Sequence, residues 1–250
     1  MQILVTNTKM NNVSKIIIFL LVLLISLPFS SALPYSENSD QSCDANGICT
    51  TTLYSYQKYH QVNNQWMQID ENFDTENCDI GYQYCVDGNL YQFNVKSVYD
   101  APTIRYGTTQ LSFKLQQLAN LPLTPSTAEI TNNQATYPNI LPGIDMQYTY
   151  LPTKVKEELI LRDRTLFVAL RNDLAVDFAL DSSGQTMTSD SHIIHVGGLS
   201  IDHLLVYDSN DNTIAIPFTL TGNTLRMTIP LAWLQNETTQ YPVIIDPTIS

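Results

Sequence analysis

The sequence predicts an all-β protein, built as one large antiparallel β-sandwich or two stacked ones after an N-terminal signal peptide. Apolar and polar residues alternate with a period of two over many short runs, the pattern of half-buried strands. Clusters of Asn, Asp, Gly and Ser fall between those runs, where a strand should reverse. Helical periodicity is sustained nowhere, and only residues 230–234 are expected to form a helical turn.

Residues 1–32 are interpreted as the signal peptide. Lys9 and Lys15 give a basic start, and the apolar run Ile16–Phe29 ends at the small residues Ser30-Ser31-Ala32. The run is about 14 residues long, which suits a signal peptide and falls short of the ~20 residues of a membrane span. An uncleaved anchor is the alternative. No second apolar run follows, so we expect no membrane span after signal cleavage.

Charge and composition restrict the partners. The chain has 12 basic and 24 acidic residues, and residues 1–32 contain two lysines and no acids, so the mature balance is 10 against 24, or −14. An acidic surface argues against nucleic acid and anionic membranes as partners. Charged residues make up only 14% of the chain, which is typical of extracellular β-proteins rather than cytosolic helical enzymes.

Four cysteines lie between positions 43 and 85. An even count in an exported chain predicts disulfides, with three possible pairings. The simplest joins Cys43 to Cys49 and Cys78 to Cys85, and the first loop contains Asn46-Gly47, a strong hairpin-turn signal. The spacings are not C-x2-C, so we do not expect a zinc site here.

The strand runs follow one another along the chain, with turns between them. Strands are expected at 91–95, 111–116, 144–150, 155–161, 176–180, 214–220, 225–229 and 243–245. Turns are expected at 63–64, 87–89, 142–143, 182–184, 208–212, 222–223 and 246–248. Asp145, within an apolar strand, is expected to hydrogen-bond neighbouring backbone.

These elements predict a domain order. Residues 33–49 are interpreted as a linker with the first cysteine loop, and residues 50–118 as an N-terminal β region stapled by the two cysteine pairs. The proline-containing stretch 119–136 is interpreted as a second linker, before a main β-sandwich module at 137–250. The sequence leaves open whether the two β regions are separate domains or one continuous sandwich.

Three segments together resemble a known module. The first is Tyr54–Asp70, with YSYQKYH and then NQWMQID; the second is Tyr137–Leu161, with YPNILPGIDMQY and then VKEELIL. The third is Trp233-Leu234 followed by YPVIIDPT at Tyr241–Thr248. In order and spacing they resemble the secreted β-rich module that precedes DNRLRE repeats and occurs in Rhs-like, wall-associated surface proteins. The cysteine pairs are not part of that pattern.

The resemblance implies a building block of large surface-displayed chains, with no established catalytic residues. Such modules lead into repeats, so the sequence is either a fragment that continues into repeats beyond Ser250 or a short relative that kept only the first module. We therefore expect a non-catalytic structural or adhesive module, secreted or at the cell surface, without a cofactor. Its partner would be a cell-surface glycan or another surface protein. The rival hypothesis is a carbohydrate-binding module or a secreted hydrolase fragment, because function is grafted onto sandwiches independently of the scaffold. The 14 tyrosines give the carbohydrate hypothesis weak support.

Histidines are the first candidates for metal or acid–base chemistry. His192 and His195 are three residues apart, which in a strand places them on opposite faces. His203 is a third imidazole nearby in sequence, and surface positions are expected for these residues. His60 lies in the hairpin motif and is expected to pack or hydrogen-bond across strands. No metal site is predicted.

The stretch Asp208–Asn212 begins like a calcium loop, with oxygen-bearing side chains at alternate positions. Thr213 and Thr219 then stand where such a loop needs glycine and a bidentate glutamate. A polar hairpin turn is expected, with a calcium site of another kind as the alternative.

Five carboxylates could supply the acid pair of a glycosidase, although sequence alone cannot place any two of them together. They are Asp145, Glu157, Glu158, Asp163 and Asp177. No nucleophile elbow, P-loop or dinucleotide fingerprint is present. Asn236-Glu237-Thr238 is a glycosylation sequon in a polar stretch, so Asn236 is expected to be accessible.

Overall fold

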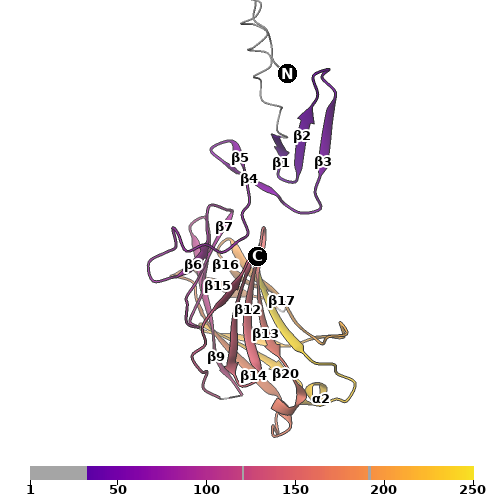
Figure 1. Ribbon diagram of the computed structural model, residues 1–250. Coiled ribbons are helices and arrows are strands. Elements are labelled where there is room, and N and C mark those ends of the chain that lie inside the picture. Colours follow the sequence, from indigo (N-terminus) through magenta and orange to yellow (C-terminus); the bar gives the residue numbers. More distant parts are fainter. Residues whose placement is uncertain (1–32, 120, 191–192) are drawn as a thin grey trace, which may run out of the picture. The chain divides into compact units, whose positions relative to one another are not determined.

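The computed structural model describes residues 33–119, 121–190 and 193–250 (Figure 1). The expected signal peptide, residues 1–32, lies outside the described residues. The chain divides into two compact units, Met1–Ser55 and Tyr56–Ser250. Antiparallel strands dominate the described residues of both units, which confirms the predicted all-β class.

The N-terminal unit contains a three-stranded meander, where a linker was predicted. Strands β1 (Leu33–Ser36), β2 (Ser39–Cys43) and β3 (Cys49–Leu53) pair in that order. Among the side chains described from 36 to 55, only the polar residues Ser39 and Asp40 are buried. Period-two hydrophobicity signals a strand only where one face is buried, so this sheet left no such pattern in the sequence.

The C-terminal unit contains two large sheets. The seven-stranded sheet has the order β19-β20-β14-β9-β8-β7-β6. Its strands are β6 (Tyr84–Val86), β7 (Tyr91–Val95), β8 (Thr103–Tyr106), β9 (Thr109–Leu118), β14 (Leu174–Asp181), β19 (Phe218–Thr221) and β20 (Thr224–Ile229).

The nine-stranded sheet has the order β10-β11-β12-β13-β21-β17-β16-β15, with β18 also paired to β17. Its strands are β10 (Glu129–Thr131), β11 (Gln134–Leu141), β12 (Ile144–Leu151), β13 (Lys154–Leu161), β15 (Met187–Ser189), β16 (Ile194–Val196), β17 (Leu199–Tyr207), β18 (Thr213–Ala215) and β21 (Val243–Ile249). A separate hairpin joins β4 (Tyr59–Val62) to β5 (Gln65–Gln68).

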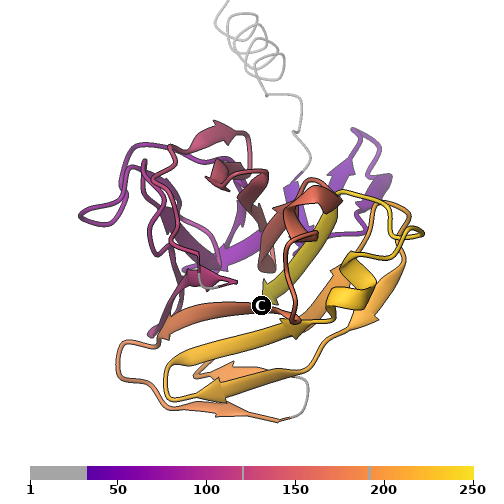
Figure 2. The same ribbon diagram turned by 90° about the horizontal axis from the view of Figure 1, so that it is seen from below.

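The two large sheets pack as a sandwich around one apolar core (Figure 2). Tyr148 of β12 shows this directly, because its ring contacts Phe93 of β7 and Phe113 of β9 on the opposite sheet. Both ring-centroid distances are 5.8 Å. All three side chains are buried. Tilted and edge-to-face aromatic pairs at this distance add stability beyond the area they bury.

The two β regions predicted from the sequence form one continuous sandwich rather than two. Strands β6–β9, from the predicted region 50–118, lie in one sheet with β14, β19 and β20. Phe178 of β14 pairs with Leu115 of β9 across the predicted boundary. The stretch 119–136 also contains β10 and the start of β11, so it is more than a linker. The unit boundary lies instead after Ser55.

Residues at two of the predicted turns have the positive φ values that these turns require. Asn63 and Asn64 have φ values of 51° and 63°, and they form the two-residue turn between paired Val62 and Gln65. Positive φ at both central residues is the requirement of the type I′ hairpin. Gly143 has a φ of 76°, and a Cβ there would lie 3.0 Å from Leu166. The positive φ favours glycine at this turn, and a larger residue would in addition displace the Leu166 side chain.

Two predictions near prolines were wrong. The run 214–220 is not one strand, because it breaks at Pro217 into β18 and β19, which belong to different sheets. Asp246-Pro247-Thr248 is not a turn, because it lies inside β21 between β13 and β17.

Strand β21 accommodates Pro247 through irregular pairing on β17. That strand bulges between Asp202 and Leu205, which face Thr248 and Asp246. A bulge is one of the few settings in which a sheet tolerates a residue without an N–H group. The predicted helical turn, in contrast, is confirmed as α2 (Leu231–Leu234).

Candidate functional site

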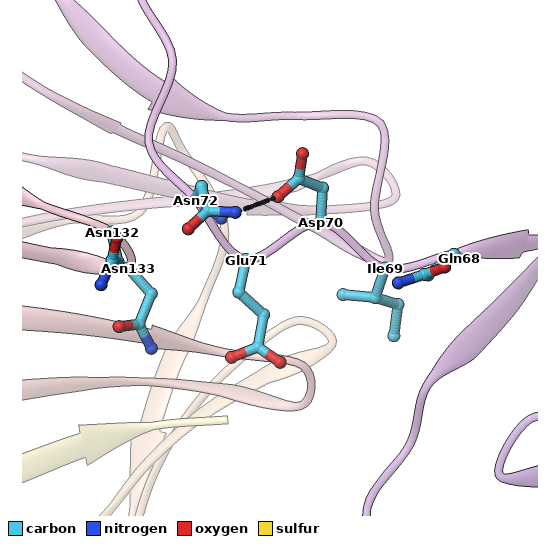
Figure 3. Close-up of a pocket in the computed structure, with 7 residues that line it drawn as sticks. All are labelled: Gln68, Ile69, Asp70, Glu71, Asn72, Asn132 and Asn133. Atoms are coloured by element: carbon cyan, nitrogen blue, oxygen red, sulfur yellow. Dashed lines mark hydrogen bonds between the residues drawn. The ribbon is translucent and has the colours of Figure 1, made fainter.

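An open polar pocket of about 740 Å³ lies where the chain leaves β5 and meets the β10–β11 turn (Figure 3). Its lining consists of Gln68, Ile69, Asp70, Glu71, Asn72, Asn132 and Asn133. Backbone contacts join its two sides, since the Phe73 N–H donates to the Asn132 carbonyl at 3.0 Å. The Asp70 N–H also donates to Asn89 Oδ1 at 3.1 Å, which anchors the segment to the β6–β7 turn.

The two acidic side chains of the pocket have different environments. Asp70 turns toward Asn72, whose backbone N–H and side-chain amide donate to Asp70 Oδ1 at 3.0 and 2.8 Å. Glu71 extends between Asn133 and Ile69 (Figure 3). Partial burial, and then the neighbouring charge of Asp70, raise the pKa of Glu71. The pocket thus presents a carboxylate among amide donors and acceptors, a set suited to a hydroxyl-rich ligand.

Sequence reasoning did not single out this pocket. Its two walls, 68–72 and 132–133, are far apart in the chain and meet only through tertiary structure. The one available signal was local polarity. Asp70–Asn72 and Asn132-Asn133 are runs of amide or acidic residues that lie close to the end of a strand.

Two of the candidate catalytic carboxylates are paired with arginine. Asp177 accepts two hydrogen bonds from Arg226, both 2.6 Å, and one of 2.8 Å from Gln117. Arg226 accordingly lowers the pKa of Asp177. Asp145 binds Arg162 Nε at 2.7 Å and, as predicted, accepts a backbone bond, from the Asn139 N–H at 2.7 Å. The arginine pair of Asp177 is bidentate, with one bond to each carboxylate oxygen, which favours the charged form of Asp177.

Glu157 and Glu158 are neighbours on β13 and face opposite sides of the sheet. Glu157 is buried in the core and accepts a 3.0 Å hydrogen bond from the Tyr148 hydroxyl. Burial raises the pKa of Glu157 well above its ordinary value. Glu158 instead binds Lys156 Nζ and the Tyr207 hydroxyl, each at 2.9 Å.

Asp163, the fifth carboxylate, caps the 3-10 helix η1 (Arg164–Phe167). Its Oδ1 accepts the Thr165 N–H at 2.9 Å. Each of the five candidate carboxylates therefore has its own hydrogen-bond partners in the fold.

The histidines are dispersed. His60 is buried in β4, in line with its predicted packing role, and His195 is exposed in β16. His203 lies in β17, and His192 lies outside the described residues. Across 33–119, 121–190 and 193–250, no group of three or more His, Cys, Asp or Glu side chains is arranged to hold a metal ion.

The calcium-like stretch forms the polar turn between β17 and β18. Asp208 Oδ1 accepts the N–H groups of Asn210 and Asn212 at 2.9 and 3.0 Å. Its Oδ2 accepts the Asn212 amide at 2.9 Å and the Gln240 N–H at 3.1 Å. Although burial acts in the opposite direction, these donors lower the pKa of Asp208 to about 2. The Asp208 carboxylate therefore stabilises the turn through these four hydrogen bonds.

The predicted disulfide pairing agrees with the structure. Disulfides join Cys43 to Cys49 and Cys78 to Cys85. Asn236 is exposed just after α2, in a turn where its Oδ1 accepts the Thr238 N–H at 2.9 Å. The sequon is thus accessible, as expected.

Comparisons with known proteins add no relative. No family model matches the chain, and neither a curated protein nor a solved structure matches it significantly. Within the described ranges, no helix has the length and apolar character needed to cross a membrane.

Proposed function

We propose that this protein is a non-catalytic, extracytoplasmic β-sandwich module with a structural or adhesive role. One observation carries the proposal: the carboxylates that the sequence offered for catalysis are each held by a structural partner. Asp177 binds Arg226, Glu157 is buried against Tyr148, and Asp163 caps η1. Two disulfides support an oxidising compartment. The resemblance to modules preceding DNRLRE repeats supports display at the cell surface.

The test separates stability from catalysis. We expect the disulfide-intact protein to release no product from a panel of polysaccharides and aryl glycosides. Asp177→Asn should lower the free energy of unfolding by about 1.5–3 kcal/mol, because it weakens a charge-assisted pair. Turnover that disappears when one carboxylate is replaced, while the unfolding curve stays unchanged, would establish a hydrolase instead.

Carbohydrate binding is the second candidate function, and the Glu71 pocket favours it. Carboxylate and amide groups around an open depression match the alternating donors and acceptors of sugar hydroxyls. A glycan array should then show saturable binding that Glu71→Gln weakens at least tenfold. Glu129→Gln, an exposed change on β10 outside the pocket lining, is the matched control and should bind like the parent. Equal binding by the parent and Glu71→Gln would exclude this pocket.

A further inference from the structure

The N-terminal unit contains a sheet edge, the outer edge of β3, that the described residues leave unprotected. Strand β3 is the last strand of the order β1-β2-β3, and in the described part of the chain its other edge pairs with no strand. All five of its side chains are exposed. Folded proteins usually protect such an edge with lysine, proline or a bulge, since open backbone groups recruit further strands.

The register shows which backbone groups this edge presents. Cys43 and Cys49 are directly opposite with a Cα–Cα distance of 3.9 Å, the close spacing of a non-hydrogen-bonded pair. The backbone bonds from Asp44 to Ile48 and from Tyr54 to Asn38 fit the same alternation. The residues between them that face β2 are therefore Thr50 and Thr52. Cys49, Thr51 and Leu53 direct their N–H and C=O groups outward.

The side chains along this edge carry no charge. Residues 48–54 read Ile-Cys-Thr-Thr-Thr-Leu-Tyr, without an acid, a base or a proline, in a chain of net charge −12. Ile48 and Leu53 are large apolar residues that are 68% and 75% exposed. Two acidic copies of the chain would repel one another generally, so a neutral strand is where they can approach most closely.

We propose that β3 is a homotypic docking edge, where the β3 strands of two copies pair antiparallel into one continuous six-stranded sheet. The two-fold axis passes through Thr51. This register opposes Cys49 to Leu53, Thr50 to Thr52 and Ile48 to Tyr54 of the second copy. Every pair is then Thr–Thr or apolar, the kinds that stabilise antiparallel strands. The outward N–H and C=O groups of Cys49, Thr51 and Leu53 bond to those of the second copy.

This inference goes beyond the proposed structural or adhesive role and does not depend on it or on the Glu71 pocket. A closed two-fold contact is the commonest way for identical chains to associate. It also gives the exposed apolar residues Ile48 and Leu53 a partner surface.

Sedimentation equilibrium of the disulfide-intact protein over a range of concentrations tests the proposal. We expect a reversible monomer–dimer equilibrium. Thr51→Pro removes an outward N–H group and a long side-chain bond from Gln41 (3.4 Å), leaves the backbone bonds between β2 and β3 intact, and should weaken dimerisation at least tenfold. Thr51→Val keeps that N–H group and should therefore dimerise more tightly than Thr51→Pro, while Thr188→Val, an exposed change on β15 outside the paired strand, is the control that should dimerise like the parent. Intact mass, less four hydrogens, shows that each variant has formed both disulfides.

Thr51→Lys keeps the test decisive if the proline variant fails to form its disulfides. It places two like charges together at the two-fold axis, so dimerisation should weaken at low salt and partly recover at high salt. Three results would overturn the proposal: a parent that is monomeric at every concentration, association that grows open-ended rather than stopping at the dimer, or a folded Thr51→Pro or Thr51→Lys variant that dimerises like the parent.

Discussion

The two units of this protein use different means to hold antiparallel strands. The sandwich buries large aromatic side chains from both sheets, such as Tyr148, Phe93 and Phe113. The three-stranded meander buries only Ser39 and Asp40 among its described side chains, and relies on backbone pairing and the Cys43–Cys49 disulfide. Strand pairing without an apolar face is only marginally stable in water.

The contrast teaches that a strand pattern in a sequence reports burial rather than strand pairing. Strand β13 alternates between buried and partly buried positions along its whole length, whereas every side chain of β3 is exposed. Both are strands, and only the first has a recognisable hydrophobic period. The stability of the two units should therefore respond to different changes.

Removing a core ring should have the largest effect. Phe113→Ala should lower the free energy of unfolding of the sandwich by about 3–5 kcal/mol, because it leaves a cavity against Tyr148. Leu53→Ala, the matched large-to-small change in the exposed meander, should change it by less than about 0.5 kcal/mol. Urea denaturation followed by tyrosine and tryptophan fluorescence measures both. Equal losses at a concentration where the chain is monomeric would contradict the difference between the two units.

Removing each disulfide should affect a different unit. Each bridge closes a loop of only a few residues, so each should contribute about 2 kcal/mol by restricting the unfolded chain. Cys43→Ser with Cys49→Ser should expose the meander to protease and leave the sandwich resistant. Cys78→Ser with Cys85→Ser should loosen β6 at the sheet edge, because Cys85 is fully buried there.

Limited proteolysis with mass mapping distinguishes these outcomes. In both variants the strands from 136 to 250 should remain uncut. Cleavage throughout the sandwich after loss of Cys43–Cys49 would contradict the independence of the two units.

The last predicted effect is a pH dependence of stability that comes from Glu157. Its folded pKa is raised by burial above the unfolded value of about 4.3, so its stabilising contribution is complete below that pH and is lost as pH rises through the folded pKa. Glu157→Gln mimics the neutral acid and removes this dependence. As pH rises from 4 to 8, the free energy of unfolding of the variant should increase relative to that of the parent. The increase should be about 1.4 kcal/mol for each unit by which the folded pKa of Glu157 exceeds the unfolded pKa.

Urea denaturation of both proteins at several pH values measures this difference. Asp246 also has a pKa raised by burial, and because it is common to both proteins its contribution largely cancels. A constant difference between the two proteins from pH 4 to pH 8 would show that Glu157 titrates normally in the folded state.

The sequence predicted those parts of the fold that local chemistry determines. Period-two alternation located β9, β12 and β13; β9 and β13 mainly bury alternate residues, while β12 is buried on both faces. Asn63-Asn64 and Pro142-Gly143 specified their turns, because positive φ restricts the residues that can occupy them. The backbone contact of Asp145 was also predicted correctly.

Features that depend on pairing between distant segments could not be predicted. Asp177 was a candidate acid until the register of β14 with β20 placed it opposite Arg226. The Pro247 error has the same origin, since only the bulge in the neighbouring β17 lets a proline lie inside a strand. The Glu71 pocket likewise needs the hydrogen bond from Phe73 to Asn132, which joins two distant segments.

Native-state hydrogen exchange of the unreduced protein at increasing urea tests the contrast between the two units most directly. We expect the amides of β9, β12, β13 and β21 to exchange only through global unfolding, with one common urea dependence. The amides of β2 and β3 should exchange through a local opening of much lower free energy and little urea dependence. Protection of β2 and β3 equal to that of the sandwich strands would contradict the contrast, because the meander would then share the stability of the core.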